Sequence, residues 1–261
     1  MRTPTASLRR KTHTRVLQGA GFTKIVWLFL GVLVLASTAR AQTRPPIVEQ
    51  LGKTYGIDSY GQIDAVRYTF NVDLPALKFN VSRTWTWEPK TGQVIYEAKD
   101  KDGKPVKVTY NRSQLSSAPD NVKNEIEPGF VNDNYWFIFP FHVNWDTSAV
   151  VTVKDKQQLP LGKGTATLVS VKYAPEIGGY TPGDTWDLFL GSDGRIKEFT
   201  YHRGGPQKPR LLSTTWAGYK KAGPLLVSTE HRGTADGAPA HIFFSNVAVK
   251  LAGSDNWIDA K

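Results

Sequence analysis

The sequence predicts a mainly β protein, with a single curved antiparallel sheet of about eleven strands, a half-open barrel, covered by two or so short helices. Three observations predict this fold class. Apolar and polar residues alternate along many short stretches, which is typical of strands with one buried face. Turn-forming pairs such as Asp102-Gly103 and Asp193-Gly194 separate these stretches, as they do in hairpins. The 261-residue chain is 40% hydrophobic and 11% aromatic, which is enough for a substantial core.

The strands follow from this alternation in chain order. In residues 65–73 the positions from Val66 to Val72 alternate between apolar and polar, and residues 79–88 repeat the pattern except that Arg83 falls on the apolar side. The same criteria give the full set of expected strands, at residues 65–73, 79–88, 93–99, 105–111, 149–155, 165–173, 184–191, 195–203, 210–217, 224–232 and 240–250. Neighbouring strands twist by about 20 to 25°, so a sheet of this size is expected to curl.

Two segments interrupt the strands. Residues 45–55 begin with two prolines and end before Gly56, which is typical of a short helix. Residues 116–126 open with serines and a proline and continue with polar helix formers, so we expect a second helix between the fourth and fifth strands. No repeat or linker divides the chain after residue 41, and residues 42–261 are therefore expected to form one domain.

Residues 1–41 have the pattern of a secretory signal peptide. A basic stretch precedes the apolar run Ile25–Ala36, which is too short to span a bilayer comfortably. Ala39 and Ala41 are small residues of the kind that a signal peptidase requires, so we expect cleavage before Gln42 and a mature protein in the periplasm or outside the cell. The protein would then meet the membrane only through this segment before cleavage. The alternative is that the segment is retained as a membrane anchor.

Removal of residues 1–41 changes the charge of the protein. They contain seven Lys and Arg and no acidic residue, so the formal net charge falls from +10 to +3. A protein that binds phosphate backbones should keep a concentrated positive surface, and we therefore expect no nucleic-acid partner. The chain has no cysteine, and its five histidines lack the spacing of zinc ligands, so we expect no metal and no cofactor.

The aromatic stretch at residues 132–146, NDNYWFIFPFHVNWD, has two interpretations. Its rings could fill the curled sheet as core, with Pro140 setting a bend, or they could line a cavity for a lipid tail or another apolar ligand. Arg83 favours a pocket, because a guanidinium is costly to bury without a polar ligand or a partner; a buried pair with an Asp or Glu, or a slipped strand register, is the alternative. The candidate ligand-binding residues are Arg83, Trp85, Trp87, Tyr135, Trp136, Phe137, Phe139, Phe141 and Trp145.

The sequence His-Arg-Gly occurs twice, at residues 202–204 and 231–233. In a meander, the strands that end there run in the same direction with one strand between them, so their tips are expected on one rim about 10 Å apart. A polar rim of this kind could receive a phosphate, sulfate or carboxylate group, and solvated turns are the alternative. The candidate rim residues are His202, Arg203, His231, Arg232 and His241.

The sequence offers little support for an enzyme, and we expect no catalytic residues. His142 could form an acid–base set with Asp133 and Asp146, but no Gly-x-Ser-x-Gly motif marks a nucleophile, and Ser148 lies in no special context. An uncharacterised hydrolase therefore remains only an alternative. A histidine with a structural role is the simpler interpretation of His142.

The order of helix, four strands, helical cover and seven strands resembles the periplasmic lipoprotein carriers of the LolA/LolB-like superfamily. Residues 83–92 (RTWTWEPKTG), 132–142 (NDNYWFIFPFH) and 178–184 (GGYTPGD) are most similar to uncharacterised exported bacterial proteins of the outer-membrane lipoprotein-sorting type. The resemblance implies an unclosed barrel whose concave face holds a lipid or the acyl chains of a lipoprotein as its partner. An envelope structural or interaction domain, whose aromatics fill its own core, is the alternative function.

Overall fold

The computed structural model describes residues 44–176 and 182–261. The expected signal peptide and residues 178–181 of the third resembling stretch lie outside these ranges. In the described part of the chain the strands, in order, are β1 (Ile63–Leu74), β2 (Phe79–Trp87), β3 (Gln93–Lys99), β4 (Pro105–Asn111), β5 (Val150–Gln158), β6 (Thr165–Lys172), β7 (Thr185–Leu190), β8 (Ile196–His202), β9 (Leu211–Thr215), β10 (Ala217–Ala222), β11 (Leu225–Ala235), β12 (Ala238–Leu251) and β13 (Trp257–Asp259).

These strands form one antiparallel sheet, which confirms the predicted fold class. Eleven of them follow one another in the order β4-β3-β2-β1-β12-β11-β9-β8-β7-β6-β5, and each expected strand corresponds to one member of this series. The sheet is not closed, since β4 and β5 form its two edges. The sequence did not indicate β10 and β13, which pair with β11 and β12, because β10 reads AGYKKA without clear alternation and β13 has three residues.

The first helix, α1 (Pro46–Tyr55), confirms the prediction for residues 45–55. Pro46 occupies its first turn, where a missing N–H costs nothing, and Gly56 ends it with φ of 93°, in the left-handed region. A 3₁₀ turn, η1 (Ile57–Gln62), leads from there into β1. Further 3₁₀ turns are η2 (Pro75–Leu77), between β1 and β2, and η3 (Arg112–Ser117), after β4.

The second helix begins later than the sequence predicted. Residues 122–126 form a single π turn, η4 (Val122–Ile126), and the main helix is α2 (Glu127–Trp145), which contains most of the aromatic stretch. Helical periodicity is not visible there because apolar side chains point to all sides of α2, as expected for a helix that is buried all round. Pro140 lies inside α2, and the helix is kinked at Ile138, where φ is −126° and ψ is 34°, so the expected bend is confirmed.

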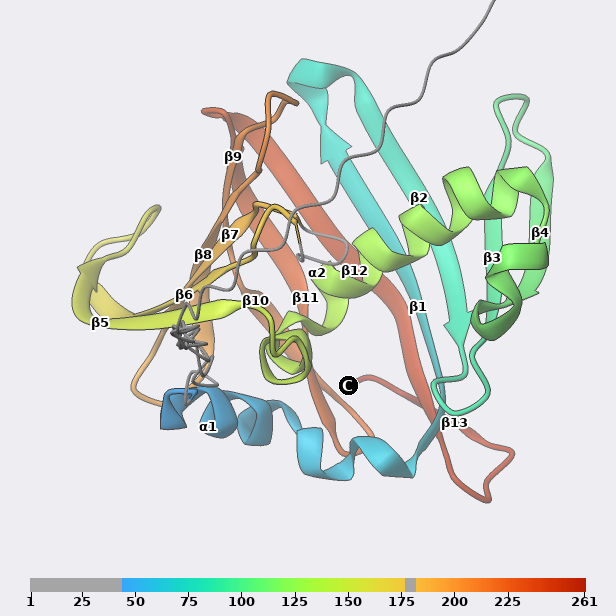
Figure 1. Ribbon diagram of the computed structural model, residues 1–261, viewed down its shortest axis with the longest axis horizontal. Helices are drawn as coiled ribbons and strands as arrows, with labels where there is room; N and C mark the ends of the chain where they lie inside the picture. Colours follow the sequence, from blue (N-terminus) through green and yellow to red (C-terminus); the bar gives the residue numbers. More distant parts are fainter. Residues whose placement is uncertain (1–43, 177–181) are drawn as a thin grey trace, which may run out of the picture. The chain divides into compact units, whose positions relative to one another are not determined.

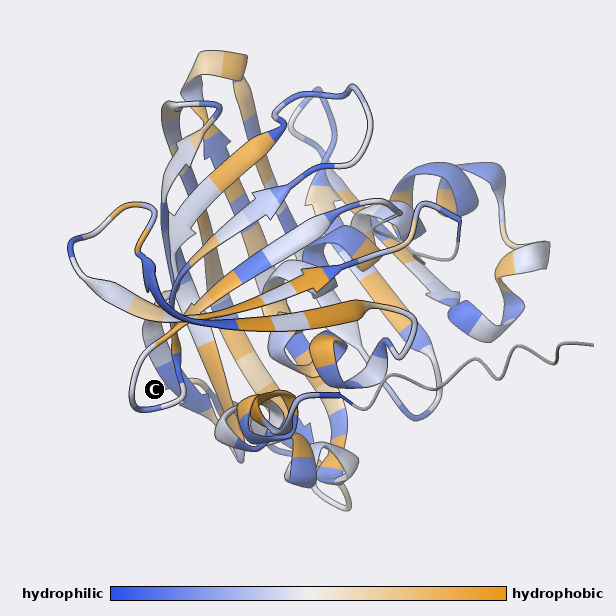
Figure 2. Cartoon of the chain, turned by 60° about the vertical axis from the view of Figure 1, so that its left-hand side comes forward, coloured by the Kyte–Doolittle hydropathy of each residue, from blue (hydrophilic) through white to orange (hydrophobic). Residues whose placement is uncertain are grey.

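Helix α2 lies across the inner face of the sheet and contacts strands that are far apart in the sheet order (Figure 1). Phe137 stacks on Tyr68 of β1 with ring centroids 4.3 Å apart, and Phe139 stacks on Trp186 of β7 at 4.2 Å. Because β1 and β7 are separated by four strands, the sheet must curve around the helix to make both contacts. Figure 2 shows the alternation of hydrophobic and hydrophilic residues along the strands that face this core. In the ranges described above, no helix is both long and apolar enough to cross a membrane.

Candidate ligand-binding groove

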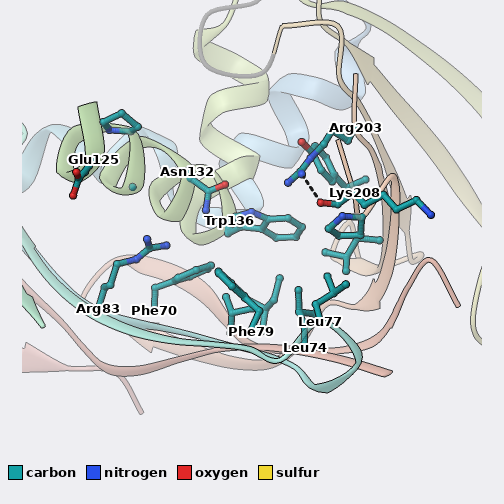
Figure 3. Close-up of a pocket in the computed structure, with 17 residues that line it drawn as sticks. Phe70, Leu74, Leu77, Phe79, Arg83, Glu125, Asn132, Trp136, Arg203 and Lys208 are labelled. Atoms are coloured by element: carbon teal, nitrogen blue, oxygen red, sulfur yellow. Dashed lines mark hydrogen bonds between the residues drawn. The ribbon is translucent and has the colours of Figure 1, made fainter. Parts of the chain in front are cut away.

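A groove of about 500 Å³ opens between the sheet and the amino-terminal half of α2 (Figure 3). We call it the edge groove, because it lies at the end of the strands where β1 and β8 finish and β9 begins; the edge strands β4 and β5 do not contribute to it. Its floor comes from β1, β9 and β12. The connections between β1 and β2 and between β8 and β9 border its mouth. The main apolar residues that line it are Phe70, Val72, Leu74, Trp136, Leu212 and Ile242.

Strand alternation and register place these apolar side chains together. In β1 the residues at even positions face inward, and the register with β12 pairs Phe70 with Phe244 and Val72 with Ile242. Leu212 on β9 extends the same surface. Trp136 of α2 covers this floor from the opposite side. A concave, mostly apolar space of this size is of the kind that takes small apolar ligands.

Two large apolar side chains remain exposed at the mouth of the edge groove. Leu77, in the connection between β1 and β2, is 51% exposed, and Phe79, the first residue of β2, is 46% exposed. This connection is tight: η2 ends at Lys78, which adopts φ of 49°. Exposed apolar residues that adjoin an apolar groove are typical of ligand-binding or interaction sites.

Arg83 lies at one end of the edge groove and is paired with a buried carboxylate. Its Nε and Nη2 atoms donate to the two oxygens of Asp133 at 2.9 and 2.7 Å. The Asp133 carboxylate also accepts from Trp85 Nε1 at 2.8 Å and from Asn132 Nδ2 at 3.0 Å. Burial nevertheless raises the pKa of Asp133 to about 6, although Arg83 and the other donors act to lower it. The alternative of a buried pair is therefore confirmed for Arg83, which also borders the groove.

Arg203 lies at the opposite end, and its contacts are different. Its Nη1 atom donates to the backbone oxygen of Lys208 at 3.0 Å, and no carboxylate within residues 44–176 and 182–261 forms an ion pair with it. The nearby Asp184 carboxylate is already engaged, since it accepts from the Tyr201 hydroxyl at 2.7 Å and from the Gly204 N–H at 2.6 Å. Burial and the Asp184 carboxylate raise the pKa of Tyr201, so this hydroxyl stays protonated.

Of the nine candidate ligand-binding residues, Arg83 and Trp136 border the edge groove. Most of the others pack in the core against further aromatic rings: Trp85 meets Phe130 at 5.4 Å, and Phe139 stacks on Trp186 at 4.2 Å. Trp145 is 39% exposed and packs on Tyr60. The remaining candidates, which are buried away from the edge groove, are Trp87, Tyr135, Phe137 and Phe141. The aromatic stretch thus fills most of the interior, and the open space lies beside it.

The five candidate rim residues are not brought together. His231 lies inside β11, which continues to Ala235; it is fully buried against Trp216, and burial lowers its pKa to about 3. His241 faces the outer side of the sheet, where its Nε2 atom lies 2.9 Å from Glu230, and Arg232 pairs with the same carboxylate. His202 is also on the outer face, beside Asp187. The expected common rim is therefore wrong, and only Arg203 borders the groove.

The repeated His-Arg-Gly sequence has a packing explanation at its glycines. A Cβ on Gly233 would lie 1.9 Å from the backbone oxygen of Ser213, and one on Gly204 would lie 2.8 Å from the backbone oxygen of Pro182. Both positions therefore need a residue without a side chain. The two copies of the motif share this steric constraint and not a common site.

Of the three groups considered for acid–base chemistry, His142 and Asp146 lie near each other and Asp133 lies apart from them. His142 Nε2 lies 2.9 Å from Asn134, its ring stacks on Tyr135 at 3.8 Å, and burial lowers its pKa. Asp146 accepts from the hydroxyls of Tyr135 and Tyr173, whereas Asp133 is bound to Arg83. Within the described residues no cluster of three or more His, Cys, Asp or Glu side chains is placed to hold a metal ion.

Several residues of the edge groove were not predicted from the sequence. Leu77, Phe79, Leu212 and Ile242 looked like ordinary strand or turn residues, because alternation shows which face of a strand is apolar but not which part of that face stays uncovered. Leu77 and Phe79, which flank Lys78 shortly after Pro75, are the one local signal that could have indicated an exposed apolar turn.

The fold and the groove define a class of protein: an open antiparallel sheet that curves around a central helix and leaves an apolar space at one end of its central strands. No family model and no curated protein matches the sequence. The chain is structurally similar to a domain assigned as an outer membrane lipoprotein-sorting protein from Vibrio parahaemolyticus, with 10% identity, coverage of 81% of this chain and 94% of that chain, and a TM-score of 0.44.

Two further solved structures are similar to the same extent. A LolA superfamily protein from Nitrosomonas europaea has 9% identity, 79% and 94% coverage of the two chains and a TM-score of 0.41. A DUF1329 family protein from Desulfovibrio piger has 8% identity, 80% and 93% coverage and a TM-score of 0.41. The similarity to the LolA superfamily that the sequence suggested is thus present, at low sequence identity, and it concerns the fold alone.

Proposed function

We propose that this protein is an exported binding or carrier protein that holds the hydrocarbon part of a lipid or lipoprotein acyl chain in the edge groove. The observation that carries the proposal is the apolar space of about 500 Å³ between β1, β12, β9 and α2. Its volume falls within the range of about 300 to 1,000 Å³ that is usual for small-molecule sites. The exposed Leu77 and Phe79 at its mouth add an apolar surface that a bound chain would cover.

The expected export of the chain is consistent with this role. A soluble carrier of lipid is needed where a lipid must cross an aqueous compartment, and an acyl chain is shielded from water only if it enters a groove of this kind. The pattern of residues 1–41 is the basis for placing the mature protein in the periplasm or outside the cell.

The packing of α2 favours a second candidate function. Its aromatic side chains fill most of the space inside the sheet, as expected for an envelope structural or interaction domain with its own solid core. The edge strand β5 also exposes Val150 and Val153, at 46% and 38%. A partner could pair with this edge or cover these side chains without using the groove.

Binding to a blocked groove separates the two functions. The substitution Ile242→Trp places a large ring on the groove floor, whereas Val153→Trp adds the same ring on exposed β5 and serves as the matched control. Isothermal titration with palmitate and with uncharged monopalmitoylglycerol should give saturable binding to the wild type and to Val153→Trp, and binding to Ile242→Trp that is weaker by about tenfold or more.

Thermal unfolding of each variant checks that the added ring has not disrupted the fold, and Val72→Phe provides a second, smaller block of the same floor. The carrier function is rejected if neither amphiphile binds to the wild type. It is also rejected if folded, blocked variants bind both amphiphiles as tightly as the wild type does.

A further inference from the structure

The two arginines that border the edge groove differ in the charge that they present. Arg83 is neutralised by Asp133, with two hydrogen bonds to its carboxylate, and its guanidinium also lies over the ring of Phe70 at 5.6 Å. Arg203 donates a hydrogen bond to a neutral backbone oxygen, and no carboxylate among the described residues forms an ion pair with it. The groove therefore carries its unbalanced positive charge at the Arg203 end.

The surrounding charged groups preserve this difference. Glu125, which also lines the groove, lies at the Arg83 end, while Lys208 lies at the Arg203 end (Figure 3). The Lys208 side chain extends outward and is exposed, so its ammonium group is free to move toward a bound anion. Asp184, which lines a neighbouring pocket together with Arg203, has its two oxygens occupied by Tyr201 and Gly204.

The size of the groove limits the apolar part of the ligand. The groove volume of about 500 Å³ lies in the lower half of the range of about 300 to 1,000 Å³ that is usual for small-molecule sites, so we expect it to hold one long acyl chain. Two chains of the same length need about twice the volume.

We infer that the edge groove selects a single-chain amphiphile with an anionic head group, which binds at Arg203 while the chain lies along Val72, Leu212 and Ile242. This inference rests on the proposed function and adds the chemical class of the ligand. A guanidinium donates two parallel hydrogen bonds to a carboxylate or a phosphate, which an uncharged glycerol ester cannot match. The head group lies at the mouth of the groove and stays partly solvated, so binding does not carry the full free-energy cost of removing its charge from water.

The test compares ligands that share one chain and differ in the head group. Palmitate supplies a carboxylate, palmitoyl lysophosphatidic acid a phosphate, and monopalmitoylglycerol no charge; each is titrated below its micelle concentration at pH 8 and low salt. We expect at least one of the anionic ligands to bind the wild type about tenfold more tightly than the neutral ester, and the better anion identifies the head group. Dipalmitoyl phosphatidic acid should bind more weakly than the single-chain phosphate.

Arginine variants at the two ends of β8 identify the residue responsible. Arg203→Gln should lower the affinity for the preferred anion about tenfold, to the level of the neutral ester, and Arg203→Lys should keep part of the preference. Arg195→Gln is the matched control, because Arg195 precedes β8, at the opposite end of that strand from Arg203, and pairs with Asp193. It should keep the full preference.

Each outcome decides between the two proposals. If all four amphiphiles fail to bind, the proposed function is wrong and this inference falls with it. If the neutral ester binds as tightly as both single-chain anions, or if Arg203→Gln keeps the preference, the groove binds lipid but the head-group assignment is wrong. Tighter binding of the two-chain phosphatidic acid overturns the assignment of a single chain.

Discussion

At the scale of single residues, the interior of the protein contains a carboxylate whose charge is stabilised by one cation. Asp133 is completely buried on α2, and it is held by Arg83 of β2 together with the indole N–H of Trp85. Gly129 lies beside this contact: a Cβ there would lie 3.3 Å from Arg83 Nη1, so the guanidinium would have to shift by a few tenths of an ångström. The pair therefore fixes the position of α2 over β2 and the Arg83 end of the groove.

The protonation of Asp133 gives stability a pH dependence of known sign. Its pKa in the folded protein is about 6, above the ordinary value of 3.8, so the folded chain holds the proton more tightly than the unfolded chain. This contribution to the free energy of unfolding is present below about pH 4 and is lost as the pH rises through 6. The difference between the two pKa values corresponds to about 3 kcal/mol.

The substitution Asp133→Asn removes this titration and tests it. We expect the free energy of unfolding of the wild type, measured relative to the variant by urea unfolding, to fall by about 2 kcal/mol between pH 4 and pH 7. Other titrating groups are common to both proteins and cancel in the comparison. A difference that stays constant, or that grows as the pH rises, would show that the pKa of Asp133 is not raised.

At the scale of elements, the sequence predicted the strands better than the helix that covers them. Alternation is a local property, so residues 65–73 and 79–88 were recognisable as strands without knowledge of their neighbours. Helix α2 was not recognisable, because it is apolar on all sides and contains Pro140, a residue that usually ends a helix. Contacts with both halves of the sheet stabilise it in spite of the kink at Ile138.

Strand β11 shows why the rim prediction failed. The motif at residues 231–233 looked like a strand end, but Gly233 lies inside the strand, where β9 approaches so closely that a Cβ would meet the backbone of Ser213. In the sequence, a glycine next to a histidine indicates a polar turn. In the structure, both residues lie in the packed region between β9, β11 and β12.

This close approach predicts a large effect from one methyl group. Gly233→Ala should destabilise the protein by about 3 kcal/mol, because the backbone of β9 must move away from β11. Gly61→Ala in η1 is the matched control, since a Cβ there has no atom within 4 Å, and its effect should be small. Urea unfolding of both variants measures the difference. Equal stabilities of the two variants would mean that β9 and β11 do not pack as described.

At the scale of the whole sheet, its class follows from the sequence, but the pairing of β1 with β12 and the position of the groove do not. The sequence could indicate that the aromatic stretch covers the sheet, and it does. It could not indicate that the rings of Phe137 and Phe139 would fill the centre while the space near Val72 and Ile242 stayed open. Cavities depend on how side chains from distant parts of the chain fit together. The sequence could not indicate, for the same reason, that Arg203 would border the groove while the other rim candidates would not.

The most direct test of the central claim is a crystal structure of the protein with a palmitate analogue that carries bromine near the end of its chain. We expect the anomalous signal of bromine inside the edge groove, between Val72 of β1 and Ile242 of β12, with the carboxylate near Arg203. An ordered ligand bound elsewhere, such as along the exposed edge strand β5, or a saturated crystal whose groove contains no bromine, would contradict the account.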